Sequence, residues 1–231
     1  MAEESDDSTR EEVFMESTNA LWTLERKVQW NALAPISKLP QEVLLQIFSY
    51  HRYGIPRHSF FPTWISITHV CRLFRSISLN CPSLWNNIVL SSSEWTQVML
   101  ARAGMVPLEI DTRSLNFQEH TQRQNLCIVL SHLLRIRILS LIGVPAISRD
   151  VLAALIAHPA PLLESFTHST EKEEFTMILP DDIFQGGQVP RLKELSLIGC
   201  NFSWTSPLFR DSLTSLSLRC GNEMALPSMF N

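Results

Sequence analysis

Glycine, tyrosine and charged residues are scarce in this chain of 231 residues. It contains 7 glycines and 2 tyrosines, and 18% of its residues are charged. The low glycine content argues against the glycine-rich loops that bind nucleotides. The 19 Lys and Arg residues are outnumbered by 23 Asp and Glu residues, which gives a net charge of −4. That charge excludes a basic nucleic-acid-binding protein of the usual kind.

Long apolar runs and paired cysteines are also missing. The longest strongly apolar run covers residues 151–157, far short of the roughly 20 residues that span a bilayer, so we expect no membrane association. The acidic N-terminus lacks the apolar stretch of a signal peptide. The 5 cysteines contain no CxxC pair and are expected to be reduced thiols. These features favour a cytoplasmic or nuclear protein.

The start of the chain is acidic. Residues 1–12 contain six acids and one base, and we expect them to form a disordered tail. Residues 13–34 are predicted to form a helix, because Ala20, Leu21, Leu24 and Val28 recur at helical spacing. This helix is expected to pack on the domain that follows it.

Leucine is abundant in the second part of the chain, 91–231. The pattern Leu-x-x-Leu-x-Leu is typical of the strands of leucine-rich repeats. The best copy is 192–201, and the string Leu-Ser-Leu-Ile-Gly occurs both there and in 136–143. A third copy lies at 213–220, and weaker copies lie at 105–110 and 163–168.

Helical patterns separate these predicted strands. A helix over 94–103 has Ser93 as a candidate N-cap and Gly104 as a stop signal. Further helices are predicted over 126–134, 148–157 and 181–185. Alternating strands and helices at this period predict an irregular leucine-rich-repeat solenoid with a curved parallel sheet. The exposed strand residues expected to bind a partner are Ser140, Lys193, Ser196, Ser217 and Arg219.

A different pattern occupies residues 35–90. Pro40 suits the first turn of a helix, and the i, i+4 pairs Val43/Ile47 and Leu44/Phe48 follow it. This short helix is apolar over more than half its circumference, so it must be covered on two sides. A second helix is predicted over 63–75. It is followed by a turn or short third helix that ends at Trp85, and then by a strand at 86–90.

Three segments of this region resemble the F-box. They are Leu39-Pro40-x-Glu42-Val43-Leu44-x-x-Ile47-Phe48, Val70-Cys71-Arg72-x-Phe74-Arg75-x-Ile77 and Cys81-Pro82-Ser83-Leu84-Trp85. The order is more closely similar to F-box-like proteins of mushroom-forming fungi, which also carry a preceding helix and degenerate leucine-rich repeats. Phe74 stands where many relatives have Trp, so a large aromatic anchor is kept.

The resemblance implies a three-helix F-box that docks onto a Skp-family adaptor and, through it, a cullin. The protein would be a non-catalytic substrate receptor of a ubiquitin ligase, holding an unknown protein substrate on its repeats for degradation. The chain ends eleven residues after Cys220 without a clear polar cap, like a shortened version of a longer relative. The implied adaptor-binding residues are Leu39, Pro40, Val43, Leu44, Ile47, Phe48, Val70, Cys71, Phe74 and Trp85.

Two other interpretations remain open at this point. A leucine-rich scaffold could bind a protein partner without any ubiquitin role. A hydrolase is disfavoured, because the chain contains no GxSxG, GxGxxG, P-loop or HExxH motif. The 7 histidines show no pair at metal-ligand spacing, so neither a metal nor a cofactor is expected.

Overall fold

The computed structural model describes residues 23–54, 63–113, 120–143, 149–170 and 177–219. The chain divides into two compact units. The first consists of Met1–His51 and Trp64–Asn80, and the second of Arg52–Thr63 and Cys81–Asn231. The predicted acidic tail, 1–12, lies outside the described residues.

The first unit is helical. Helix is present over 23–33, followed by the 3-10 turn η1 (Pro35–Lys38) and the helix α2 (Gln41–Gly54). The 3-10 helix η2 (Thr63–His69) and the helix α3 (Arg72–Leu79) complete it. The carbonyl oxygen of Pro40 accepts hydrogen bonds from the N–H groups of Val43 and Leu44. Proline therefore starts α2 at the position where its missing N–H costs nothing.

Cys71 interrupts the single helix predicted over 63–75. Its backbone is extended, with φ −156° and ψ 170°, and its Sγ accepts a hydrogen bond from the N–H of Phe74 at 3.5 Å. An extended residue whose side chain bonds the third following N–H is an N-cap. The cysteine thus ends one helical segment and begins α3.

The second unit is built on a six-stranded parallel sheet, as predicted. Its strands follow one another in chain order, with β5 (Met177–Ile178) and β7 (Cys200–Asn201) forming a separate parallel pair. Each predicted copy of the leucine pattern overlaps one strand of the six-stranded sheet, and the copy at 192–201 also includes β7. The six strands are β1 (Asn87–Ile88), β2 (Leu108–Asp111), β3 (Ile136–Ile142), β4 (Ser165–Ser169), β6 (Glu194–Ile198) and β8 (Ser215–Arg219).

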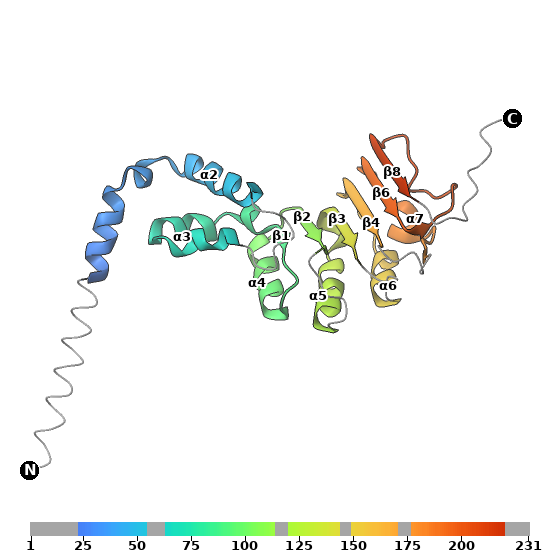
Figure 1. Ribbon diagram of the computed structural model, residues 1–231, viewed down its shortest axis with the longest axis horizontal. Helices are drawn as coiled ribbons and strands as arrows, with labels where there is room; N and C mark the ends of the chain where they lie inside the picture. The colour runs from blue at the N-terminus through green and yellow to red at the C-terminus, as the bar shows by residue number, and fades with distance from the viewer. Residues whose placement is uncertain (1–22, 55–62, 114–119, 144–148, 171–176, 220–231) are drawn as a thin grey trace, which may run out of the picture. The chain divides into compact units, whose positions relative to one another are not determined.

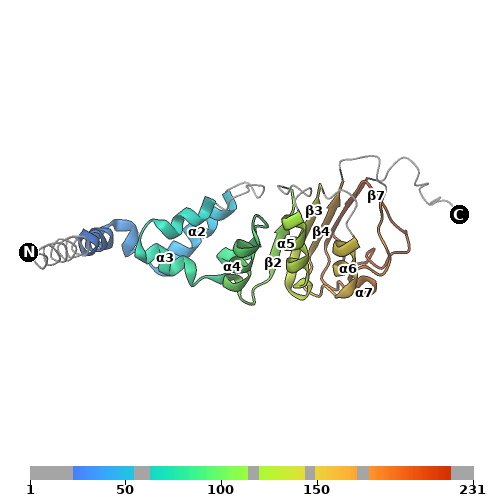
Figure 2. The same ribbon diagram turned by 90° about the horizontal axis from the view of Figure 1, so that it is seen from below.

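Helices connect the strands and lie on one side of them. Figures 1 and 2 show α4, α5 and α6 side by side along the sheet. Their bounds are Ser93–Ala103 for α4, His120–Leu130 for α5 and Arg149–Ala157 for α6. The remaining helical elements are α7 (Ile183–Gly187) and the 3-10 helices η3 (Pro82–Trp85) and η4 (Leu133–Arg135). Gly104 ends α4 at φ 53°, as expected, but the N-cap is Ser92, whose Oγ accepts from the N–H of Trp95. Ser93 instead donates to Asn125 Oδ1 at 2.8 Å.

The core of the second unit is a row of apolar side chains in register. Ile110, Leu139, Phe166 and Leu195 are paired across neighbouring strands, and each is at most 1% exposed. Because side chains alternate along a strand, the residues between these positions face the other side of the sheet. The leucine pattern therefore gives the sheet one buried face and one open face.

Three of the ionisable residues buried in this unit are Arg52, Glu109 and His168. The Glu109 carboxylate lies 3.7 Å from Arg52 Nη2 and accepts a hydrogen bond from Arg137 Nη2 at 2.5 Å. Removing one partner of such a buried cluster is strongly destabilising. His168 is 1% exposed, and this burial lowers its pKa, so the imidazole is neutral at neutral pH.

Gly143 and Gly199 offer a matched test of the strand ends. Both have φ of +71°, but a Cβ at Gly199 would lie 2.6 Å from Thr170 Cγ2, whereas one at Gly143 meets nothing within 4 Å. We expect Gly143→Ala to lower the free energy of unfolding by about 1–2 kcal/mol, the cost of a left-handed residue. Gly199→Ala should lose at least about 1 kcal/mol more through steric overlap. Urea unfolding of both variants tests this, and equal losses would contradict it.

Candidate functional site

Exposed apolar side chains are concentrated in the first unit. Of the sixteen large hydrophobic residues that are exposed in the described chain, ten lie there. A concentration of this kind marks an interaction surface. We call these residues the exposed apolar set: Leu24, Trp30, Leu33, Ile36, Leu39, Val43, Ile47, Tyr50, Val70 and Leu73.

Helix α2 shows most clearly why this surface exists. Its Leu44 and Phe48 are 1% and 2% exposed, whereas Val43 and Ile47 are 37% and 40% exposed. Both pairs have i, i+4 spacing, so each pair occupies one face of the helix. The sequence predicted that this helix needs cover on two sides. Among the described residues, one side of α2 is buried within the unit and the other side is exposed.

The predicted adaptor-binding residues divide by burial into two groups. Six of them are exposed or half-buried: Leu39, Pro40, Val43, Ile47, Val70 and Cys71. The other four are Leu44, Phe48, Phe74 and Trp85, which are at most 8% exposed. The structure assigns these four to the interior instead of to a docking surface.

Packing explains the burial of Phe74 and Trp85. The rings of Phe48 and Phe74 have centroids 4.9 Å apart at an interplanar angle of 60°, so Phe74 anchors α3 to α2 and not to a partner. Trp85 belongs to the second unit, where its ring meets Trp95 edge-on at 6.4 Å and Arg102 lies 4.3 Å above it. Both aromatic residues therefore hold their own units together.

Sequence reasoning missed several exposed residues of the first unit. Tyr50 is 78% exposed and follows Val43 and Ile47 at i+7 and i+3, which places it on the same helix face. That spacing was available in the sequence. Trp30 is 74% exposed, but the helical pattern around it was interpreted only as packing on the following domain.

The open face of the second unit carries a row of small polar residues. Strand pairing aligns Asp111, Ser140, Thr167, Ser196 and Ser217. Three of the five predicted substrate-binding residues lie in this row. Of the other two, Arg219 lies two residues after Ser217 and is paired with Ile198, and Lys193 precedes β6.

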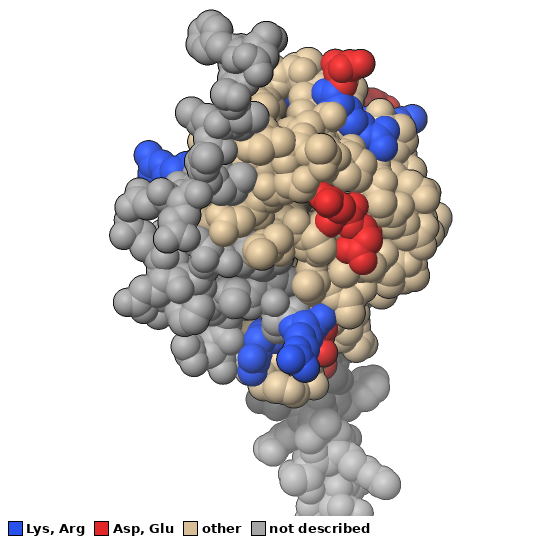
Figure 3. All heavy atoms as spheres, turned by 90° about the vertical axis from the view of Figure 1, so that its right-hand side faces the viewer, with Lys and Arg blue, Asp and Glu red and all other residues tan. Residues whose placement is uncertain are grey.

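One member of this row is charged. Asp111 is already paired with Arg113, whose Nη2 lies 2.5 Å from Asp111 Oδ2. Viewed from the side of β8, the coloured part of the surface shows a few charged side chains, with both signs next to each other at the top and at the bottom of the view (Figure 3). The row therefore presents the hydroxyl groups of Ser140, Thr167, Ser196 and Ser217 beside one paired carboxylate.

Comparison with known families agrees with the sequence-based resemblance for part of the chain. The F-box-like family model matches residues 36–91. The chain carries an F-box-like domain. F-box domains typically bind Skp-family adaptors. No curated protein and no solved structure matches the chain.

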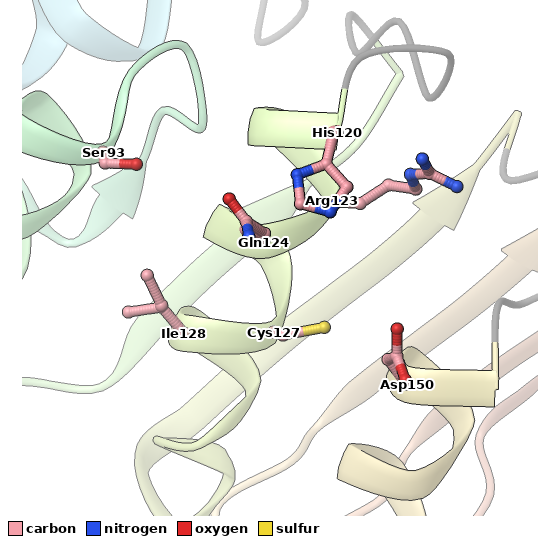
Figure 4. A pocket seen from close by; sticks show the side chains of 7 residues that line it. All are labelled: Ser93, His120, Arg123, Gln124, Cys127, Ile128 and Asp150. Atoms are coloured by element: carbon pink, nitrogen blue, oxygen red, sulfur yellow. The ribbon is translucent and has the colours of Figure 1, made fainter.

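A pocket outside the F-box-like domain lies among α4, α5 and α6 and has a volume of about 600 Å³. Figure 4 shows Cys127 pointing from α5 towards α6, where Asp150 lies. Burial, and secondarily the charge of Asp150, raises the pKa of the Cys127 thiol, so it is not an activated nucleophile. The lining residues are Ser93, His120, Arg123, Gln124, Cys127, Ile128 and Asp150.

The described ranges contain neither a metal-binding cluster nor a membrane-spanning helix. No group of three or more His, Cys, Asp or Glu side chains is arranged to hold a metal ion there. No helix of the described residues is both long enough and apolar enough to cross a membrane.

Phe74 and Val70 distinguish core from surface within the F-box-like domain. Phe74 is 8% exposed and Val70 is 63% exposed. We expect Phe74→Ala to lower the free energy of unfolding by about 3–5 kcal/mol, and Val70→Ala to change it by at most about 0.5 kcal/mol. Urea unfolding followed by circular dichroism measures both. A large loss at Val70 would mean that the first unit packs differently.

Proposed function

We propose that this chain is the substrate-recognition subunit of a Skp–cullin–F-box ubiquitin ligase. The observation that carries the proposal is the uncovered apolar face of α2 within the F-box-like domain at residues 36–91. The domain would dock a Skp-family adaptor through Leu39, Pro40, Val43, Ile47 and Val70, and the adaptor would connect the chain to a cullin. The chain itself would perform no chemistry and would act in the cytoplasm or the nucleus.

The second unit would hold the target protein. We infer that it is a degenerate leucine-rich-repeat solenoid, because its six parallel strands follow chain order and coincide with the leucine pattern. The polar row from Asp111 to Ser217 would contact the target. Ubiquitin transfer would then depend on proximity alone, since binding raises the local concentration of the target beside the transferring enzyme.

Adaptor binding is the first prediction to test. The chain should form a one-to-one complex with its cognate Skp-family adaptor when the two are co-expressed and separated by size-exclusion chromatography. Val43→Asp/Ile47→Asp places two charges on the uncovered face of α2 and should weaken binding at least about tenfold. Gln41→Asp/Gln46→Asp adds the same charges to the same helix at exposed polar positions and should keep the complex.

A wild-type chain that is soluble alone and does not bind the adaptor would refute the ligase proposal. The second unit would then be studied as a protein-binding scaffold without a ubiquitin role. The polar row on the open face of the sheet does not depend on adaptor binding. It therefore supports this alternative as well.

Target binding through the polar row is tested separately. Ser196→Trp/Ser217→Trp places two large side chains on the open face, where neither serine is part of the buried row. Proteins that co-purify with the wild-type chain should be lost with this variant, while the adaptor is retained as an internal control. Co-purification of the same proteins in equal amounts would show that the target binds elsewhere.

A further inference from the structure

The row of inward-facing apolar side chains loses its cover at β8, the last strand of the six-stranded sheet. Ile110, Leu139, Phe166 and Leu195 are at most 1% exposed, whereas Leu216, which is paired with Leu195, is 50% exposed. Figure 1 shows β8 at the end of the sheet, next to β6. The buried row therefore ends in an apolar side chain that no further strand of the described chain covers.

The connection after β4 covers the inward side chain of that strand. Phe184 of α7 packs edge-on against Phe166 of β4, with ring centroids 5.2 Å apart. In the connection after β6, Leu208 is fully buried. The two connections are in contact, because Arg210 Nη2 donates a hydrogen bond to the carbonyl oxygen of Gly187. Connections therefore stack on one another in the same order as the strands.

The connection after β6 presents an aromatic cluster. The rings of Trp204 and Phe209 are stacked, with centroids 5.9 Å apart at an interplanar angle of 24°, and Phe202 lies 5.2 Å and 5.3 Å from them. Trp204 is 39% exposed. A further connection that stacks on this one would cover both Trp204 and Leu216.

The residues after β8 repeat the pattern of the residues after β6. Segment 213–231 aligns without a gap on 192–210 at a shift of 21 residues, which is also the shift between the paired Leu195 and Leu216. In this alignment the fully buried Leu208 corresponds to Met229. Six positions are identical: Leu192/Leu213, Leu195/Leu216, Ser196/Ser217, Leu197/Leu218, Asn201/Asn222 and Phe209/Phe230.

We propose that residues 220–231 cover the open end of the second unit and pack over Leu216 and Trp204 as a further connection. Met229 would occupy the place that Leu208 has one repeat earlier, and Phe230 the place of Phe209. The outermost repeat of a solenoid needs such a cover, because its apolar core otherwise meets water. The segment follows β8 directly. The inference does not depend on adaptor binding.

Two pairs of aspartates in this segment test the proposal. Met229→Asp/Phe230→Asp would place charges in the contact with Leu216 and Trp204. Hydrogen exchange of the amides in 213–219, measured on the full chain by mass spectrometry, should then become at least about tenfold faster. Ala225→Asp/Leu226→Asp adds the same charges at positions that correspond to the exposed Trp204 and Thr205. This control should exchange within about twofold of wild type, and β3 serves as the internal reference in both variants.

A double-mutant cycle tests the contact itself. Leu216→Ala and Phe230→Ala are made singly and together, and the unfolding equilibrium constant of each variant is measured in urea. The two changes should depart from additivity by at least about twofold in that constant, because residues in contact share their interaction energy. Leu216→Ala combined with Leu226→Ala is the control pair and should be additive.

Three results would overturn the proposal. If Met229→Asp/Phe230→Asp leaves exchange in 213–219 unchanged, the segment does not cover the end of the sheet. If both aspartate pairs accelerate exchange equally, the correspondence at a shift of 21 residues is wrong. If protection of 213–219 instead rises with protein concentration while light scattering shows a doubled mass, a second copy of the chain covers β8.

Discussion

Parallel, in-register pairing of short strands is the constraint on which the second unit depends. A single strand with its helix cannot bury its own apolar edge. Each strand buries the apolar edge of its neighbour, because the side chains Ile110, Leu139, Phe166 and Leu195 are aligned across the sheet. Phe184 from α7 closes on Phe166 with ring centroids 5.2 Å apart at 87°. The helices on one side of the sheet and the polar row on the other both follow from this alignment.

The first unit buries its apolar side chains only in part. It is too small to surround a helix that is apolar on two faces, and small units bury a smaller fraction of their surface. Leu44 and Phe48 take the available interior, and Val43, Ile47 and Tyr50 remain outside. The exposed apolar set is thus a consequence of the size of the unit as well as a basis for binding. Adaptor docking would complete a core that the chain leaves unfinished.

The strands were predictable from the sequence because the leucine pattern directly shows the alternation of buried and exposed side chains along each strand. Copies at 136–143, 192–201 and 213–220 coincide with β3, β6 and β8. Helix ends were less predictable. Ser92 and Ser93 are chemically identical candidates for the N-cap of α4, and only the extended backbone of Ser92 selects it. Likewise, Val70, Cys71 and Phe74 keep helical spacing across a break that the backbone of Cys71 introduces.

The sequence predicted the kind of residues that form the candidate site, but not which of them face outward. All ten residues expected to bind the adaptor are apolar or nearly so, and periodicity does not show which face of a short helix is inside. Phe74 and Trp85 were assigned to the surface by resemblance, whereas ring packing places them in the two cores.

The separation of buried and open positions within each strand has a consequence for how a surface of this kind can change. Buried positions such as Leu139 and Leu195 fix the fold, while Ser140, Thr167, Ser196 and Ser217 stand between them on the open face. Substitutions at the second group leave the buried row intact. The chemistry of the open face can therefore change one residue at a time while the buried row keeps the fold.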